Sequence, residues 1–265
     1  MDAGERRLLA DALRKTMTAR SGADLDASLV ELGWPHMLAE SGDEAVPMVF
    51  ALLGECGAHA PVLNDVVLHA SGRPPGSTAA LPYAGGSRVV WERDDRVSPT
   101  LDPDLPLRVA GPDEYPPLGA PALAAGRRAL AWWLVGTGRA MLASARAHVV
   151  DRAQFGRPLS SFQAVRHRLA ETLVALDGAE ATLRTADDDL GALLAKAAAG
   201  HAALTAARHC QQVLGGIGFT AEHDLHRHVR RALVLDGLLG TARESTREAG
   251  ALVRERGSAP RLARL

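Results

Sequence analysis

The sequence predicts a mainly α-helical protein: an N-terminal helical domain and a C-terminal antiparallel four-helix bundle, with a short β/loop segment between them. Alanine, the residue with the highest intrinsic helix propensity, occurs 49 times in 265 residues. Aromatic residues make up only 4%, which disfavours a large β-sandwich. From residue 121 onward the chain divides into four long helical stretches with short connections, a pattern typical of an antiparallel bundle.

Composition excludes several classes of protein. Thirty basic residues against 31 acidic ones leave no basic excess for binding nucleic acid, and 47% hydrophobic residues are too many for a disordered chain. Residues 1–15 are charged throughout, so we expect no secretory signal. The absence of an uninterrupted apolar run of about 18 residues predicts no membrane span. Two cysteines, Cys56 and Cys210, cannot build a disulfide scaffold, which favours a reducing, cytoplasmic compartment.

Residues 1–72 are expected to form short helices. Apolar residues recur at helical spacing near the N-terminus, at Leu8, Leu9, Leu13 and Met17. Further helices are expected over 28–34, where Gly33 ends the helix, over 44–56, and over 61–71, where Pro61 begins it.

Residues 73–118 are interrupted by glycine and proline, which makes helix unlikely there. Two strand-like pieces remain, Ser87–Glu92 and Leu105–Ala110, and Pro106 restricts the second to the edge of a sheet. Two such strands are too little for a stable sheet on their own.

The first two bundle helices are separated by a short turn. A helix over 121–154 is expected to end at Gly156 and Pro158, and the next to begin near Ser160 or Ser161 as its N-cap. An apolar stripe marks the buried face of that second helix: Phe162, Val165, Leu169, Leu173, Leu176 and Leu183.

The last two bundle helices follow a run of aspartates. Residues 187–189 are expected to cap a helix over 190–213, which the glycines of 215–218 break. A final helix is expected over roughly 230–256. We therefore predict an N-terminal helical domain at 1–72, a β/loop segment at 73–118, the bundle at 119–258 and a tail at 259–265.

Two motifs follow one another in the helical C-terminal half. Arg152-Ala153-Gln154-Phe155-Gly156 lies at the turn after the long helix, and Gln212-Val213-Leu214-Gly215-Gly216 lies at the end of a later helix. This pair, in this order, resembles the acyl-CoA dehydrogenase family. The N-terminal half agrees through two stretches, 31–34 and 55–61. The resemblance covers about residues 28–72 and 100–245.

The resemblance implies a fold, a cofactor and a reaction. Members have an N-terminal helical domain, a middle β-domain and a four-helix bundle; they bind FAD and dehydrogenate acyl-CoA thioesters between Cα and Cβ. Here residues 73–118 correspond to a remnant of the β-domain or to a linker, although 99–110 still resembles the end of that domain. The resemblance therefore implies a subunit that lends an FAD half-site to a partner. That partner is either a full-length paralogue, as in α2β2 members that act on bulky ring-containing acids, or a second copy of this chain in an oligomer. Electron-transfer flavoprotein or another acceptor would reoxidise the flavin.

The flavin half-site is carried over residue by residue. In the family these motifs bind the ADP half of an FAD held by a neighbouring subunit. A guanidinium suits a pyrophosphate, and paired glycines let backbone N–H groups approach it. The alternative is that the glycines only end helices and that the arginine is a solvated last-turn cation. The matching residues are Arg152, Gln154, Phe155, Phe162, Gln163, Gln212, Gly215 and Gly216.

The resemblance places Asp236 where many members have a catalytic glutamate. A carboxylate among apolar side chains suits proton abstraction, although aspartate is one methylene shorter. Leu238 and Leu239 replace the family's residues that touch the flavin. Arg127 matches a CoA-contacting arginine of some members. Two alternatives stay open: a non-oxidative enzyme that uses Asp236, and a structural subunit with no ligand.

A histidine cluster and a tryptophan pair receive structural interpretations. His223, Asp224, His226 and His228 lie within six residues, but their spacing lacks the clean pairs of a zinc motif, so we predict a solvated turn and no metal site. Trp132–Trp133 are expected to anchor the core and a subunit interface.

Overall fold

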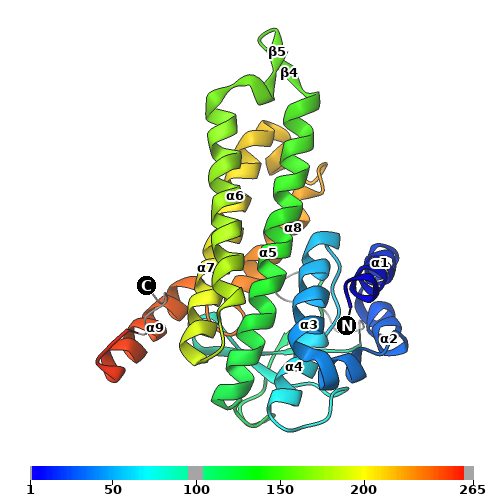
Figure 1. Cartoon of the computed structure of the whole chain (residues 1–265), viewed down its shortest axis with the longest axis vertical. Helices are drawn as coiled ribbons and strands as arrows, with labels where there is room; N and C mark the ends of the chain where they lie inside the picture. Colours follow the sequence, from blue (N-terminus) through cyan, green and yellow to red (C-terminus); the bar gives the residue numbers. More distant parts are fainter. Residues whose placement is uncertain (1, 95–103, 260–265) are drawn as a thin grey trace.

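The computed structural model describes residues 2–94 and 104–259, and a tall helical bundle rises from a broad base (Figure 1). The base contains the N-terminal helices and a small sheet. The predicted fold class is confirmed, because helices dominate and strands are few. The predicted boundaries at 72, 118 and 258 stay predictions, and residues 95–103 and 260–265 lie outside the described part of the chain.

The N-terminal helices are α1 (Ala3–Ala19), α2 (Gly22–Glu31), α3 (Trp34–Cys56) and α4 (Val62–Ala70). Two of them begin earlier than predicted, since α2 starts before residue 28 and α3 before residue 44. The apolar period of α3 is interrupted by a kink at Ser41, whose φ is −141°. This interruption explains why the sequence pattern shows only the second part of α3.

Three antiparallel strands form a sheet in the order β1 (Ala80–Tyr83), β2 (Ser87–Trp91) and β3 (Leu107–Val109). The two predicted strands are confirmed, and β3 lies at the edge as Pro106 requires. The strand β1 was not predicted, because it contains Pro82. The sheet is stable because it packs on the helices: Trp91 is fully buried and stacks on Trp133 with ring centroids 5.4 Å apart.

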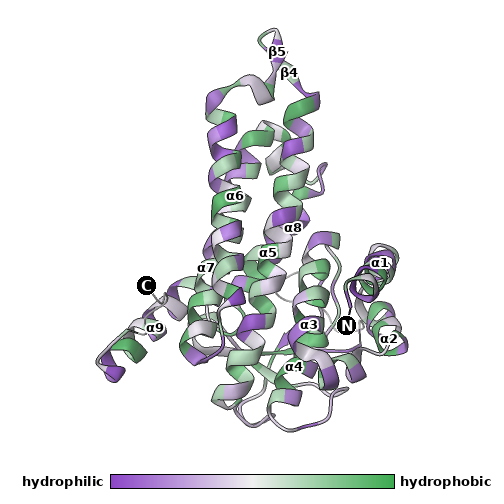
Figure 2. Cartoon of the chain, viewed as in Figure 1, coloured by the Kyte–Doolittle hydropathy of each residue, from purple (hydrophilic) through white to green (hydrophobic). Residues whose placement is uncertain are grey.

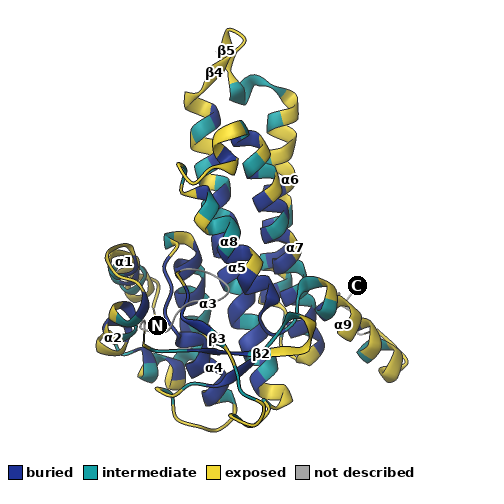
Figure 3. Ribbon diagram, turned by 180° about the vertical axis from the view of Figure 1, so that it is seen from behind, coloured by how far each residue is buried: buried dark blue, intermediate teal, exposed yellow. Residues whose placement is uncertain are grey.

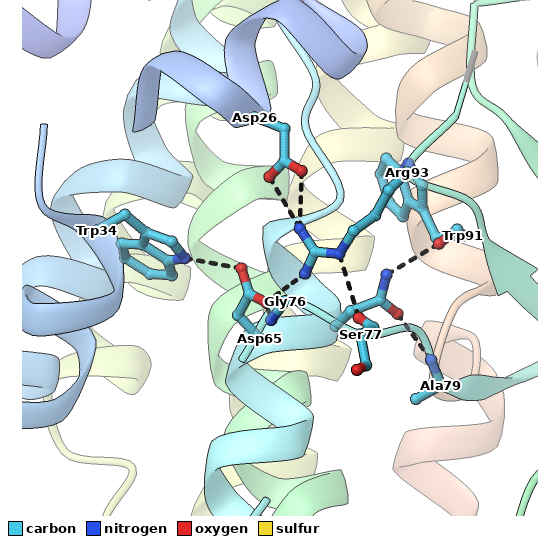
Figure 4. Close-up of polar contacts among 9 residues, drawn as sticks. Asp26, Trp34, Asp65, Gly76, Ser77, Ala79, Trp91 and Arg93 are labelled. Carbon is cyan, nitrogen blue, oxygen red and sulfur yellow. Dashed lines mark hydrogen bonds and ion pairs between the residues drawn. The ribbon is translucent and has the colours of Figure 1, made fainter. Parts of the chain in front are cut away.

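A polar network ties the sheet to α2, α3 and α4 (Figure 4). The guanidinium of Arg93 pairs with Asp26, at 2.8 Å from Oδ2, and with Asp65. Asp65 also accepts hydrogen bonds from Trp34 Nε1 at 3.0 Å and from the Gly76 amide at 2.8 Å. The carboxylate of Asp65 is only 3% exposed, so this network holds two acidic groups on a single guanidinium inside the base.

The bundle consists of α5 (Ala120–Asp151), α6 (Gln163–Arg184), α7 (Asp189–Leu214) and α8 (Leu225–Gly237). A two-stranded hairpin, β4 (Ala153–Gln154) and β5 (Arg157–Pro158), joins α5 to α6 at the tip (Figure 1). Asp188 is the N-cap of α7, as predicted, and accepts a hydrogen bond from the Gly191 amide at 2.7 Å. Trp133 is buried in the core, and Trp132 is half-buried.

Three predictions about helix ends are wrong. The helix predicted over 121–154 ends at Asp151, and Ala153–Gln154 form β4. Ser160 and Ser161 do not cap α6; they lie in a short 3₁₀ turn, and Phe162 is the N-cap. The predicted single helix over 230–256 is two helices, α8 and α9 (Ala242–Arg256), separated by Leu239 and Gly240 with φ of 55° and 97°. No proline marks this break, and a leucine rarely adopts positive φ, so the sequence gives little warning.

The buried residues lie between the bundle helices, above all α5 and α7, and in the base between α3, α4 and the sheet, while the bundle tip is exposed (Figure 3). The outer helices α1 and α9 carry many hydrophilic residues (purple in Figure 2). Within the described residues, one segment, Asp189–Phe219, is long and apolar enough to cross a membrane by length and composition alone. Most of that segment is buried among the other bundle helices, as the core helix of a bundle must be.

Candidate functional site

A groove of about 700 Å³ lies at the tip of the bundle. It is formed by the end of α5, the β4–β5 hairpin, the first two turns of α6 and the end of α7. The lining includes five of the predicted cofactor-binding residues: Arg152, Gln154, Gln212, Gly215 and Gly216. Two motifs about 60 residues apart in the chain therefore meet on one surface, as the resemblance implies.

The hairpin after α5 positions the first motif. The helix ends at Asp151, and the carbonyl of Arg152 accepts a hydrogen bond from the Leu159 amide at 2.8 Å, which closes the hairpin. Phe155 and Gly156 adopt φ of 56° and 77° at its tip. This tight reversal places the side chains of Arg152 and Gln154 beside the start of α6.

The three other predicted residues lie outside the groove lining. Phe155 is 89% exposed at the hairpin tip, and its ring packs edge-on against Phe162 at 6.2 Å. The guanidinium of Arg157 lies over the Phe162 ring at 4.1 Å. Gln163 is exposed in the first turn of α6. These residues lie on the hairpin and at the start of α6, outside the groove lining.

The second motif lies at the end of α7 and lines another side of the groove. Gly215 has φ 67° and ψ −143°, a conformation that only glycine adopts readily. The chain leaves α7 there and enters a 3₁₀ turn over Gly215–Phe219. A ligand can approach the backbone of Gly215 and Gly216 closely, since nothing lies within 4 Å of where a Cβ would stand at either position.

The groove is positively charged. Arg152 and Arg168 line it, and no acidic residue is among its described lining residues. His148 also lines it, and burial lowers the pKa of this histidine, with further lowering by His223 and Arg152. The N-terminus of α6, which has no side-chain cap, faces the groove through Ala164 and Val165. This arrangement suits an anion.

The motifs contain neither His148 nor Arg168. His148 precedes Arg152 by four residues, so extending the first motif by one helical turn finds it. Arg168 lies twelve residues beyond Gly156, and only the packing of α6 beside α7 brings it to the groove.

Asp236 lies far from this groove in the fold, near the end of α8, and is 8% exposed. Its Oδ1 accepts a hydrogen bond from the Ala242 amide at 3.0 Å and lies 3.8 Å from Lys196 Nζ. Oδ1 would also stand 2.1 Å from a Cβ on Gly200, so the two helices approach closely there. The carboxylate is engaged in holding α9 and the only buried lysine among the described residues. Its catalytic role stays a prediction.

The segment after Asp236 is closed against the sheet. Leu238 pairs with Tyr83 of β1, and the Leu239 amide donates to the Pro82 carbonyl at 2.8 Å. Both leucine side chains are buried. Backbone pairing with β1 therefore holds the two residues that follow Gly237 inside the fold.

Arg127 and the histidine cluster also have structural partners. The guanidinium of Arg127 donates to the Leu239 carbonyl at 3.0 Å and pairs with Glu248 at 2.8 Å. Its predicted contact with CoA stays a prediction. His226 Nδ1 lies 2.8 Å from the His223 carbonyl oxygen, and His228 packs against Gly57. Over residues 2–94 and 104–259, no group of three His, Cys, Asp or Glu side chains is arranged to hold a metal ion.

Comparison with known protein families finds a match over the region that contains the groove. Residues 120–251, about half of the chain, match the family described as acyl-CoA dehydrogenase, C-terminal domain. The chain belongs to the acyl-CoA dehydrogenase family. The matched region contains both motifs and all of the groove residues. The family expectation from the two motifs is therefore confirmed.

Relatives within the acyl-CoA dehydrogenase family are similar over part of their length. Acyl-CoA dehydrogenase FadE34 of Mycobacterium tuberculosis is 38% identical over 151 residues, which are 53% of this chain and 20% of that protein. This chain thus spans about a fifth of that relative. Among solved structures, the ChsE4-ChsE5 complex from Mycobacterium tuberculosis has a TM-score of 0.73 at 18% identity, over 98% of this chain and 99% of the matched chain. A glutaryl-CoA dehydrogenase from Mycobacterium smegmatis in complex with FADH2 has a TM-score of 0.70 at 16% identity, over 98% and 96%. At these identities the structures establish the fold.

Proposed function

We propose that this chain is a subunit of an FAD-dependent acyl-CoA dehydrogenase and supplies the groove that holds the ADP half of a flavin whose ring lies in a partner subunit. The observation that carries the proposal is the convergence of Arg152, Gln154, Gln212 and the glycines of η3 (Gly215–Phe219) in one positively charged groove. The partner would be a full-length paralogue, and the assembly would dehydrogenate an acyl-CoA thioester between Cα and Cβ.

The groove residues fit the group that they would hold. Arg152 would bind the pyrophosphate by charge-assisted hydrogen bonds. Gln154 and Gln212 offer amide donors and acceptors for ribose hydroxyls or an adenine edge. The open backbone at Gly215 and Gly216 admits a flat ring or a phosphate. Bound FAD would supply the acceptor for the hydride that leaves Cβ, while these residues bind and orient it.

The closed segment at Leu238–Leu239 supports a division of labour between subunits. Pairing with β1 engages the backbone of this segment, and Lys196 and Ala242 engage the Asp236 carboxylate. A flavin ring and an acyl group would then lie in the partner. The name of the neighbouring ChsE4-ChsE5 complex describes two different proteins in one assembly, which agrees with a heteromer.

We expect that Arg152→Ala reduces the flavin retained by the co-expressed complex of this chain and its paralogue. Losing a charged hydrogen-bonding partner weakens binding by about 1.5–3 kcal/mol, or tenfold or more in the Kd of FAD. The measurement is flavin absorbance per mole of purified complex. Arg146→Ala is the matched control, since Arg146 is exposed on the same helix and outside the groove lining. A colourless, stable homodimer that ignores the paralogue would contradict the proposal.

Asp236→Asn tests whether the carboxylate acts in catalysis. Its hydrogen bond and ion pair favour a structural role, so we expect the unfolding free energy to fall by about 3 kcal/mol while activity per bound flavin stays unchanged. The measurements are denaturant unfolding and turnover normalised to flavin content. A hundredfold loss of kcat with flavin retained would instead support the base role that the family resemblance implies.

A further inference from the structure

A second arginine in the groove, Arg168, lies outside both family motifs. It shares one face of α6 with Ala164 and Val165, and all three line the groove. The backbone that carries it is anchored to α7, because His209 Nδ1 lies 3.1 Å from the Arg168 carbonyl oxygen and 3.0 Å from Thr172 Oγ1. The wall that presents Arg168 is therefore fixed to the helix that ends in Gly215.

The guanidinium groups of Arg168 and Arg152 are uncommitted. Across the described ranges 2–94 and 104–259, no hydrogen bond or ion pair engages either guanidinium. The nearest candidate partner along α6, Glu171, instead points a carboxylate oxygen to within 3.8 Å of His209 Nε2. Two unpaired guanidiniums that line one groove without a carboxylate favour the binding of an anion there.

The number of charges indicates the kind of anion. Arg152 comes from the end of α5 and Arg168 from α6, so the groove presents two guanidiniums from different helices. A diphosphate carries its negative charge on two phosphate groups, and each guanidinium can form paired hydrogen bonds with one of them. We propose that Arg168 is a second phosphate-binding residue, which acts with Arg152 on the two phosphates of the ADP half of FAD. This inference rests on the proposed function.

The test uses the full chain and ADP, AMP and adenosine as probes in titration calorimetry. The wild-type chain should bind ADP more tightly than AMP, and AMP more tightly than adenosine. Arg168→Gln should weaken ADP binding about tenfold or more and reduce the preference for ADP over AMP. Arg168→Lys should recover part of the affinity, because it keeps the charge and loses the paired geometry. Arg146→Gln should bind ADP within about twofold of the wild-type chain.

The outcomes separate this inference from the proposed function. If Arg152→Gln loses ADP binding while Arg168→Gln matches Arg146→Gln, Arg168 is not a phosphate-binding residue and the groove remains. If the wild-type chain binds ADP no better than adenosine, the groove is not a pyrophosphate site and both ideas fall. Circular dichroism and melting temperature show whether each variant is folded; Arg168 is exposed, so its substitution should change neither.

Discussion

Replacing Arg93 by methionine is expected to lower the free energy of unfolding by about 3–5 kcal/mol, because removing one partner of a buried ionic network leaves the other charges uncompensated. Arg93 bridges Asp26 and Asp65, and its Nε also donates to the Ser77 carbonyl at 3.2 Å (Figure 4). Without it, the carboxylate of Asp65 keeps only Trp34 Nε1 and the Gly76 amide as partners in Figure 4. Urea unfolding followed by circular dichroism measures the change.

Two further variants serve as controls for the Arg93→Met measurement. Arg73→Met removes an exposed arginine close by in the sequence and should change stability by less than about 0.5 kcal/mol. Arg93→Lys keeps the charge but cannot reach three acceptors in the planar arrangement of a guanidinium, so we expect an intermediate loss. An Arg93→Met protein as stable as Arg73→Met would show that this network contributes nothing to the base.

The helices could be predicted from sequence wherever local signals agree with tertiary packing. Alanine-rich runs bounded by glycine or proline predicted both ends of α7 and the start of α5 to within one residue, and Asp188 capped α7 as expected. The helix α5 ends at Asp151, three residues before the predicted end, because the β4–β5 hairpin begins there. The strand β1 could not be predicted, since Pro82 argues against a strand and it is stabilised by pairing with β2 and Leu239 and by the burial of Leu81. The break after α8 likewise depends on partners distant in the sequence.

In the candidate site, too, some residues could be predicted from local motifs and others only from tertiary packing. Arg152 and Gln212 could be found because each belongs to a short contiguous motif, and both line the groove. Arg168 belongs to no motif, and only the packing of α6 on α7 brings it to the same surface. The contacts of Asp236 could not be predicted from local sequence either, because its partner Lys196 lies 40 residues earlier, on a different helix.

Lys196 contacts the chain at the break between α8 and α9, and its substitution is also expected to have a large effect on stability. Its side chain is fully buried, and Nζ donates to the carbonyls of Asp236 at 2.8 Å and of Gly240 at 2.9 Å. The ammonium therefore satisfies backbone acceptors at the end of α8, and the Gly240 carbonyl also accepts from Ser245 Oγ at 3.4 Å. Lys196→Met should lower the unfolding free energy by about 3–5 kcal/mol at pH 7, because it removes a donor from both carbonyls and leaves Asp236 without its countercharge.

The dependence of the unfolding free energy on pH tests whether the buried Lys196 causes this change in stability. Burial lowers the pKa of Lys196 to about 8, from 10.5 for an exposed lysine. At a pH between these two pKa values, the unfolded chain keeps the Lys196 proton that the folded chain has lost. The free energy of unfolding should therefore rise with pH, by about 2 kcal/mol between pH 8 and 9.5. The Lys196→Met protein should lack this rise. Lys15→Met should keep it, since Lys15 is the other lysine of the chain and is exposed. Urea unfolding of the three proteins at pH 7, 8 and 9.5 measures both effects, and equal slopes in wild type and Lys196→Met would exclude a buried lysine that gives up its proton near pH 8.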